Sequence, residues 1–194
     1  MNAALALITG VLYAKHALFG AVALASLGVA LVTTKGGRLH ERSGVLHLFV
    51  MALVLFSALA LCGVRLIQGD PAHRDASVLL AVLAVLIAEQ LTFGMRVLKW
   101  HGPESVRPAE RMLTLLTAIA GLGGVVWALT GAETAQSAVA GVLAILTAAS
   151  HRRQQAQTPV GLARVAAHRT SLQAAGVFTV GAVLFVNWAA LAPA

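Results

Sequence analysis

Charged residues are scarce in this chain. Asp, Glu, Lys and Arg together make up 11% of its 194 residues, whereas apolar residues make up 59% and the mean hydropathy is +0.85. Soluble domains are about half apolar, so this chain carries more apolar side chain than a soluble core can bury. A charge near the centre of a membrane helix costs about 3 kcal/mol, which keeps membrane proteins poor in charge. The composition therefore predicts an integral membrane protein.

Cysteine is almost absent as well. The single cysteine, Cys62, excludes a disulfide framework and a cysteine metal site within one chain. The sequence also lacks a GxSxG elbow, a P-loop, a dinucleotide fingerprint, a CxxCH and an HExxH motif. No basic region precedes the first apolar stretch, so we expect no cleavable signal peptide. These absences leave isolated polar residues as the candidates for function.

Six apolar stretches fill most of the chain, and most are long enough to cross a bilayer, which takes about 20 helical residues. We predict an all-α integral membrane bundle of about six transmembrane helices, forming a single domain over residues 1–194. For the first span we prefer an interfacial segment followed by a helix from near His16, because Lys15 would lie deep in one long helix from near Ala4. The predicted spans are Tyr13–Thr33, Ser43–Ile67, Ala76–Leu98, Pro108–Thr130, Thr134–Ser150 and Arg169–Leu191.

Basic residues cluster in every second connection between these spans. The positive-inside rule places these connections in the cytoplasm and both termini outside a bacterial plasma membrane. The net charge of +7 does not indicate nucleic acid, because the basic residues lie in short loops and form no continuous soluble face. It favours the anionic lipid surface as the partner. The clustered residues are Lys35, Arg38 and Arg42, then Arg96, Lys99, Arg107 and Arg111, then Arg152, Arg153, Arg164 and Arg169.

Local signals mark the ends of the predicted spans and their contacts. Gly36 and Gly37 end the first helix, because glycine tolerates a positive φ, and Ser43 is placed to cap the second. Small residues at helical spacing predict close approach between helices. They are Ala17, Ala21, Ala25 and Gly28 in the first span, Gly121 and Gly124 in the fourth, and Ser137 and Gly141 in the fifth. The aromatic residues expected at the membrane surfaces are Tyr13, Trp127 and Trp188 outside and Trp100 inside.

Histidine is frequent for so apolar a chain, and imidazole binds haem iron through a neutral nitrogen. We predict His47 and His168 as the axial ligands of a b-type haem at the cytoplasmic side. His40 is an alternative ligand, because it shares a face with His47 if the second helix includes both. His16 is a further candidate at the outer side, and no second histidine is obvious near it. The alternative is that these histidines bond backbone carbonyls or lipid headgroups.

Glu89 is the most unusual acid, because it follows the unbroken apolar run Val78–Ala88 and precedes Gln90. An ionisable residue inside a membrane span needs a partner or a water-filled cavity and is a candidate for function. We predict Glu89 as a catalytic or proton-carrying residue. The alternative is an ion pair with Arg96 or Arg111 near the end of the span.

Several of these residues carry a resemblance to a known kind of protein. The segment His16–Gly20, the Lys35-Gly36-Gly37 turn and the segment His40–Gly44 resemble uncharacterised bacterial multi-pass membrane proteins that share a domain of unknown function. The closing helix from His168 to Asn187 is similar to that of small membrane proteins of this kind. The resemblance implies an all-helical membrane bundle. It extends loosely, in architecture alone, to the membrane domains of b-type cytochromes.

Three functions follow from these predictions. The first is a redox membrane protein that binds haem b or exchanges electrons with a quinone. The second is a small transporter or proton-coupled carrier built around Glu89. The third is a non-catalytic membrane subunit or scaffold. The candidate partners are therefore the lipid bilayer, a quinone, a membrane partner subunit or further copies of this chain.

Overall fold

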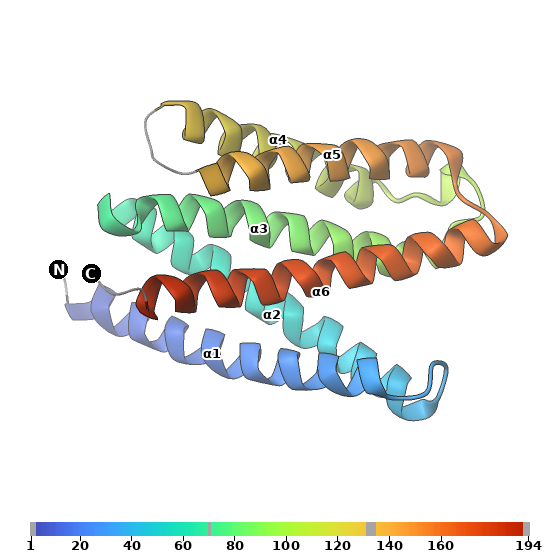
Figure 1. The fold of residues 1–194 in the computed structure, drawn as a ribbon, viewed down its shortest axis with the longest axis horizontal. Helices are drawn as coiled ribbons and strands as arrows, with labels where there is room; N and C mark the ends of the chain where they lie inside the picture. Colours follow the sequence, from blue (N-terminus) through green and yellow to red (C-terminus); the bar gives the residue numbers. More distant parts are fainter. Residues whose placement is uncertain (1–2, 70, 131–134, 192–194) are drawn as a thin grey trace. The chain divides into compact units, whose positions relative to one another are not determined.

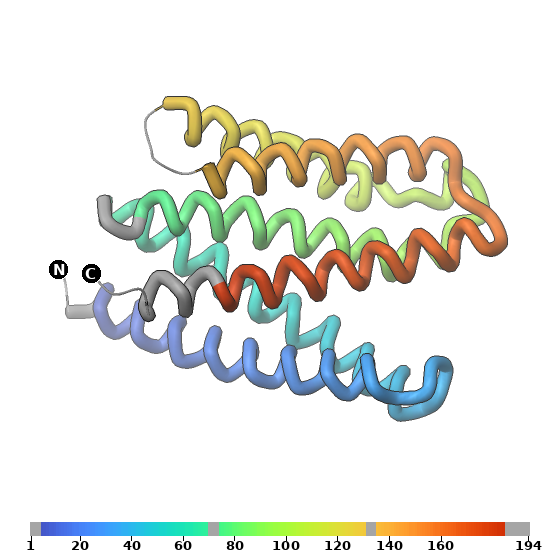
Figure 2. The backbone as a smooth tube through the Cα atoms, viewed as in Figure 1, coloured from blue at the N-terminus to red at the C-terminus, as the bar shows by residue number. Residues whose placement is uncertain are grey.

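The computed structural model describes residues 3–69, 71–130 and 135–191, and the side chains of 5–69, 74–130 and 135–184. Within these ranges the chain is helical and contains no strand, which confirms the all-α prediction (Figures 1 and 2). The helices are α1 (Ala3–Val32), α2 (Arg38–Gln68), α3 (Pro71–Arg96), α4 (Pro108–Thr130), α5 (Ala135–Gln157) and α6 (Gly161–Leu191). Two short 3₁₀ helices, η1 (Val97–Lys99) and η2 (Pro103–Ser105), lie between α3 and α4.

Helix α1 is continuous, so the preferred interfacial segment before His16 is wrong. No proline interrupts Ala3–Val32. Continuing the helix bonds the backbone N–H and C=O groups of that stretch after the first turn, which an apolar segment requires in the absence of water. The Lys15 side chain is exposed on the surface of this helix.

Helix α2 begins at Arg38, earlier than predicted, and this places both His40 and His47 on one helix. Gly36 has φ +80°, as expected for a glycine in the connecting turn, and Gly37 is the N-cap residue. The proposed cap at Ser43 is wrong: this side chain lies inside the helix, and its hydroxyl donates to the carbonyl oxygen of Leu39 at 2.8 Å.

The last two helices are also longer than predicted on their basic sides. Helix α5 continues past Ser150 to Gln157, and α6 begins at Gly161 rather than Arg169. Arg152 and Arg153 therefore lie on a helix, as do Arg164 and Arg169, and only residues 158–160 connect the two. The predicted start of the fifth span at Thr134 lies outside the described residues. The fourth helix has the predicted bounds.

Four stretches of the described chain are long and apolar enough to cross a membrane: Leu5–Val32, Arg38–Gln68, Arg74–Lys99 and Pro108–Thr130. Helix α4 shows the inverted pattern that a lipid environment favours. Its buried residues are small or polar: Glu110, Thr114, Thr117, Gly121 and Gly124. Its exposed residues include Met112, Leu115, Leu116, Ile119, Leu122 and Leu129. Exposing this apolar face to water would be unfavourable, whereas contact with the hydrocarbon of a bilayer would not be.

The chain forms two compact units, residues 1–77 (unit one) and 78–194 (unit two). In unit one, α1 and α2 pack side by side as an antiparallel pair. The seam buries Ala23, Ser26 and Ala30 of α1. The predicted ridge of small residues does not face α2, and its contact with another helix stays a prediction. Its members, Ala17, Ala21, Ala25 and Gly28, are all exposed.

In unit two, α4 and α5 approach closely through glycines, as the small-residue spacing predicted. A Cβ added to Gly121 would lie 2.6 Å from the carbonyl oxygen of Gly141, and one added to Gly124 would lie 3.2 Å from that of Ser137. Helix α6 contacts α3 at Gly94, where an added Cβ would lie 2.9 Å from Leu172. Gly121 and Gly124 thus permit a close approach to the α5 backbone, whereas Gly94 makes room for the Leu172 side chain.

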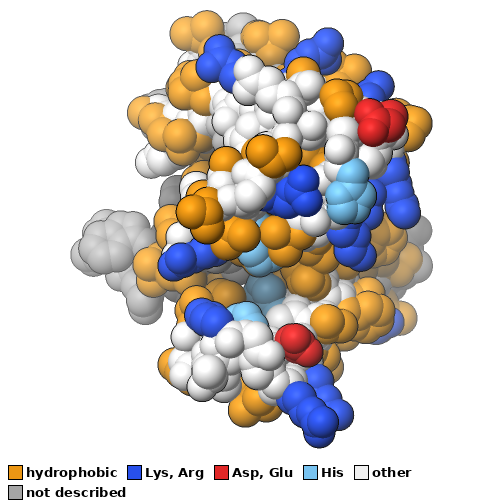
Figure 3. Space-filling model, turned by 90° about the vertical axis from the view of Figure 1, so that its right-hand side faces the viewer, with side chains coloured by type: hydrophobic (Ala, Val, Ile, Leu, Met, Phe, Trp, Pro, Cys, Tyr) orange, Lys and Arg blue, Asp and Glu red, His pale blue; other side chains and the backbone are white. Residues whose placement is uncertain are grey.

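The connections at one end of unit two are strongly basic. Helix η1 contacts α6 and η2 contacts α5, so the α3–α4 connection and the α5–α6 turn meet at this end. Figure 3 looks onto the helix ends and shows Lys and Arg side chains gathered over them. The exposed basic residues at this end of unit two are Lys99, Arg107, Arg111, Arg152, Arg153 and Arg169. Within this unit the third-to-fourth and fifth-to-sixth connections share one side, as predicted.

Candidate functional site: a buried carboxylate–histidine network

Glu89 lies on α3, is 2% exposed, and is held by side chains of two other helices. The Thr114 hydroxyl of α4 lies 2.6 Å from Glu89 Oε1, and His151 Nδ1 of α5 lies 3.0 Å from the same oxygen. A carboxylate oxygen accepts hydrogen bonds, so both neighbours donate to it when Glu89 is ionised. Three helices of unit two therefore converge on one buried acid.

Gln155 extends this network by one more hydrogen bond. It follows His151 by one helical turn, so both side chains project from the same face of α5. Its Nε2 donates to Thr114 Oγ1 at 2.8 Å. A hydroxyl carries one proton and two lone pairs, so Thr114 accepts from Gln155 while its proton points to Glu89 Oε1 at 2.6 Å, with the Glu110 carbonyl oxygen as a second acceptor at 3.0 Å. The result is a directed chain from amide to hydroxyl to carboxylate.

Aromatic rings fix the position of the imidazole. Phe93, one turn after Glu89 on α3, stacks on the His151 ring with centroids 3.6 Å apart and an interplanar angle of 10°. Trp100 then meets Phe93 edge to face at 5.2 Å. His151 is 4% exposed. The stack confines the imidazole ring, so its Nδ1 stays directed at Glu89.

A second buried carboxylate, Glu110, lies in the first turn of α4. It forms an ion pair with Arg96 and accepts a hydrogen bond from the Trp100 indole Nε1 at 2.9 Å. The backbone N–H of Arg107 also donates to it, at 3.3 Å, as in a capping box. Trp100 is fully buried within the protein, and its predicted position at the inner membrane surface stays a prediction. Its indole N–H needs an acceptor, and Glu110 supplies one.

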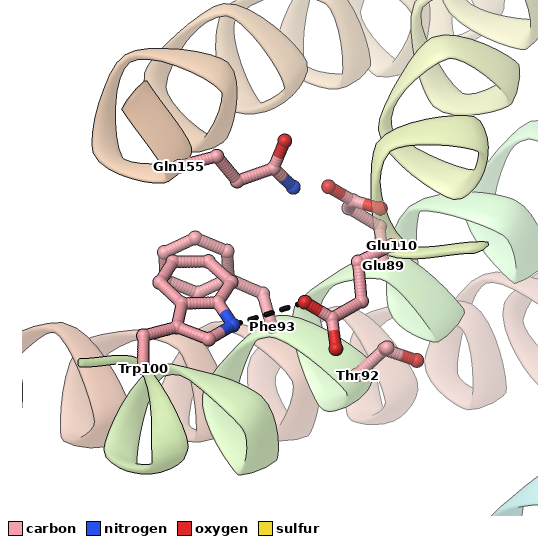
Figure 4. A pocket seen from close by; sticks show the side chains of 6 residues that line it. All are labelled: Glu89, Thr92, Phe93, Trp100, Glu110 and Gln155. Atoms are coloured by element: carbon pink, nitrogen blue, oxygen red, sulfur yellow. Dashed lines mark hydrogen bonds between the residues drawn. The ribbon is translucent and has the colours of Figure 1, made fainter. Parts of the chain in front are cut away.

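Both carboxylates line one small cavity (Figure 4). The lining residues are Glu89, Thr92, Phe93, Trp100, Glu110 and Gln155. The space open to a water centre is about 10 Å³. That is close to the minimum that one water molecule needs, and the polar lining offers it several partners.

The predicted ion pair of Glu89 with Arg96 or Arg111 is wrong. Arg96 pairs with Glu110, and Arg111 donates to the carbonyl oxygen of Pro103 at 2.9 Å. The true partner, His151, was not predicted, because the fifth span was expected to end at Ser150, which left His151 in a loop. A helix continued by one turn would have placed His151 and Gln155 on the face that carries Ala144 and Ala148. The helical spacing of these four residues was the signal by which the sequence could have indicated the longer helix.

In unit one, the predicted histidines bridge α1 and α2. His40 Nδ1 lies 2.9 Å from the carbonyl oxygen of Ala30, and His47 Nδ1 lies 3.0 Å from that of Ala23. Since a carbonyl can only accept, Nδ1 carries the hydrogen in both rings. His16 Nδ1 lies 2.9 Å from Ser57 Oγ. The structure thus places all three histidines on the facing surfaces of the same helix pair.

His168 lies in unit two, where its Nδ1 donates to the carbonyl oxygen of Gly94 at 2.6 Å. The proposed pair of axial ligands, His47 and His168, therefore belongs to different units, and their convergence stays a prediction. Among the residues that the structure describes, no group of three or more His, Cys, Asp or Glu side chains is arranged to hold a metal ion. A haem iron needs only two axial ligands from the protein.

Comparisons with known proteins find no relative. No protein-family model matches the chain, and neither a curated protein nor a solved structure does. The function must therefore be argued from the site itself.

Proposed function

We propose that this protein is a small proton-coupled membrane carrier in which the Glu89–His151 pair takes up and releases the proton. The observation that carries this proposal is the buried contact between Glu89 Oε1 and His151 Nδ1 at 3.0 Å, reinforced by Thr114. Ionisable groups within apolar helices are rare, and in membrane proteins such acid–histidine contacts serve proton pathways. The proposal concerns the class of transport and leaves its substrate open.

The chemistry of the pair supports this role. With one proton held between the carboxylate and the imidazole the pair is negative, and a second proton makes it neutral overall. Charge is costly in a low-dielectric interior, so gaining or losing that proton changes the energy of the surrounding helix packing. The α4–α5 contact through Gly121 and Gly141 lies on the same helices that supply Thr114 and His151. A change in charge at the pair thus acts on a close-packed interface.

The apolar helices support a location in a bacterial plasma membrane, with the bilayer as the first partner of the chain. The basic end of unit two supports a cytoplasmic position for that end, and both termini then lie outside. Six membrane spans are part of this proposal, of which four meet the length and composition criterion among the described residues. The resemblance to uncharacterised bacterial multi-pass membrane proteins is consistent with it.

The proposal is tested by reconstituting the protein into lipid vesicles that enclose a pH-sensitive dye. Alkali cations, divalent cations, organic cations and organic anions are added one class at a time against an imposed pH gradient. We expect one class to change the internal pH, and Glu89→Gln to abolish that change, because an amide cannot carry the proton. The matched control is Glu41→Gln, which alters an exposed acid of α2.

Two results would overturn the carrier proposal. One is a wild-type protein that moves no protons with any solute class. The other is a folded Glu89→Gln variant that transports as well as the wild type.

A second candidate function, a haem b-binding or quinone-linked redox protein, is favoured by the hydrogen bonding of the histidines. His40, His47 and His168 each donate Nδ1–H to a backbone carbonyl. In haem and metal proteins this bond orients the ring and leaves Nε2 as the ligand atom. An absorption spectrum of the purified protein, oxidised and then reduced, tests it. Sharp reduced bands that vanish in His47→Ala or His168→Ala would support haem, and a colourless protein from haem-replete cells would remove it.

A further inference from the structure

Glu110 is a second carboxylate at the same small cavity as Glu89, and nothing in the carrier proposal uses it. The two acids differ in their partners. Glu89 is held by neutral donors and an imidazole, whereas Glu110 is paired with Arg96 and lies at the start of α4, next to the basic end of unit two. A cavity that joins two such acids suggests a direction for proton movement.

We infer that one water molecule in this cavity links Glu89 to Glu110 and that Glu110 passes the proton between Glu89 and the basic end of unit two. This inference rests on the proposed proton role of Glu89 and adds the route by which the proton leaves. The cavity has room for about one water, and its lining includes both carboxylates together with Thr92 and Gln155. Figure 4 shows these side chains around the same space.

The transfer balances without any further reactant. The O–H bond of protonated Glu89 breaks as the water oxygen takes the proton. One of the water's own O–H bonds breaks as the Glu110 carboxylate accepts its proton. The water is regenerated, Glu89 becomes the carboxylate, and the net charge of the two acids is unchanged.

The exposed fractions of Glu110 and Arg96 support the part of the route that leads from Glu110 to the protein surface. Glu110 has a side-chain exposure of 7%, while its ion-pair partner Arg96 has 20% and reaches the surface. Trp100 positions Glu110 through its indole N–H, and the same ring forms part of the cavity wall. Arg107, whose backbone N–H donates to Glu110, and Arg111 in the first turn of α4 are both exposed.

Infrared spectroscopy of the reconstituted protein separates this inference from the carrier proposal. The absorption of a protonated buried carboxyl group, assigned to Glu89 by its loss in Glu89→Gln, is followed after rapid transfer from H₂O to D₂O. We expect Glu110→Gln to slow the exchange of that proton by about 100-fold, the lower range of what a positioned acid or base contributes. Glu104→Gln is the control, because Glu104 is an exposed acid of the same connection and does not line the cavity.

A second variant guards against misfolding of Glu110→Gln. Thr92→Leu fills the cavity without removing either carboxylate and should slow the exchange to a similar extent. If the Glu89 absorption is present and both variants exchange at the wild-type rate, the route through Glu110 is overturned while the carrier proposal stands. If no Glu89 absorption titrates between acidic and alkaline pH, the carrier proposal itself fails.

Discussion

The two units of this chain use their polar side chains in different ways. In unit one, His40 and His47 bond to backbone carbonyls across the α1–α2 seam, and His16 bonds to a serine hydroxyl. In unit two, ionisable groups bond to each other: Glu89 to His151 and Glu110 to Arg96. Bonds to a backbone carbonyl orient a ring without placing a second titratable group beside it. We therefore propose helix docking or ligand orientation for unit one, and proton chemistry for unit two.

The units also differ in how closely their helices approach. In unit one, a Cβ added to Gly20, Gly28 or Gly44 would meet nothing within 4 Å, whereas in unit two one added to Gly121 would strike the backbone of Gly141. Unit one is joined by side chains that reach across the seam. The α4–α5 pair of unit two is joined by direct backbone contact. Four substitutions test this contrast, from the largest expected effect to the smallest.

The largest effect is expected from Glu89→Ala. Removing the carboxylate leaves His151 buried without its acceptor, while the Thr114 hydroxyl keeps the carbonyl oxygen of Glu110. Breaking a buried ionisable pair costs about 3 kcal/mol of unfolding free energy. Thermal unfolding in mild detergent, followed by circular dichroism, measures the loss. The double variant Glu89→Ala/His151→Ala should lose less than the sum of the two single variants, because each single change already breaks the pair. Additive losses would show that the two residues do not act together.

The next largest effect is expected from Gly121→Ala, which should lower the unfolding free energy by about 2 kcal/mol through overpacking against Gly141. The matched control is Gly28→Ala in unit one, where the space around the added methyl group is open. That substitution should leave stability unchanged or raise it slightly, because alanine favours the helix. Similar losses in both variants would contradict the difference in packing between the units.

Trp100→Phe should lower the unfolding free energy by about 1.5 kcal/mol, which is the lower range for a hydrogen bond to a charged group. It removes the indole N–H that donates to Glu110 and keeps an aromatic ring in the buried position. Arg111→Gln is the control, since Arg111 is exposed and bonds only to the Pro103 carbonyl among the interactions described for it. The same unfolding experiment measures both variants. An equal loss of unfolding free energy in the two would show that the indole N–H bond to Glu110 contributes no more than an exposed hydrogen bond.

The smallest effect is expected from His47→Ala in the haem-free protein, about 0.6 kcal/mol, which is typical of a hydrogen bond between membrane helices. Ala23 keeps its helical hydrogen bond when the histidine is removed, so no buried group is left wholly unpaired. A loss as large as that of Glu89→Ala would erase the difference between the units. If the protein binds haem, His47→Ala should lower the unfolding free energy strongly only in the haem-loaded protein, because a ligand bound to the folded state stabilises that state.

The sequence predicted the helices better than the contacts. The helical class, the start of α4 at Pro108, the turn at Gly36 and the glycine contact between α4 and α5 all follow from local rules of backbone freedom and spacing. The predicted end of α5 and the predicted start of α6 were wrong, because the charged residues between them were assigned to a loop. In the structure they extend the helices beyond the apolar stretch, where a helix surface exposes arginine as readily as a loop does.

The site was only half predictable. Glu89 is conspicuous by itself, because an acid after a long apolar run needs a partner. His151, Thr114 and Gln155 are ordinary residues at their positions, and only the packing of α3 against α4 and α5 brings them to the acid. No sequence pattern singled out Glu110, which the fold buries and bonds to the Trp100 indole.

Composition and periodicity by themselves determined that this chain is a bundle of apolar helices and that Glu89 requires a partner. Both follow from the cost of exposing apolar groups to water and of burying an unpaired charge. The identity of that partner was decided only by the tertiary structure. Hydrogen bonds between side chains of different helices depend on how the helices rotate and approach, and here glycines on α4 and α5 set that approach.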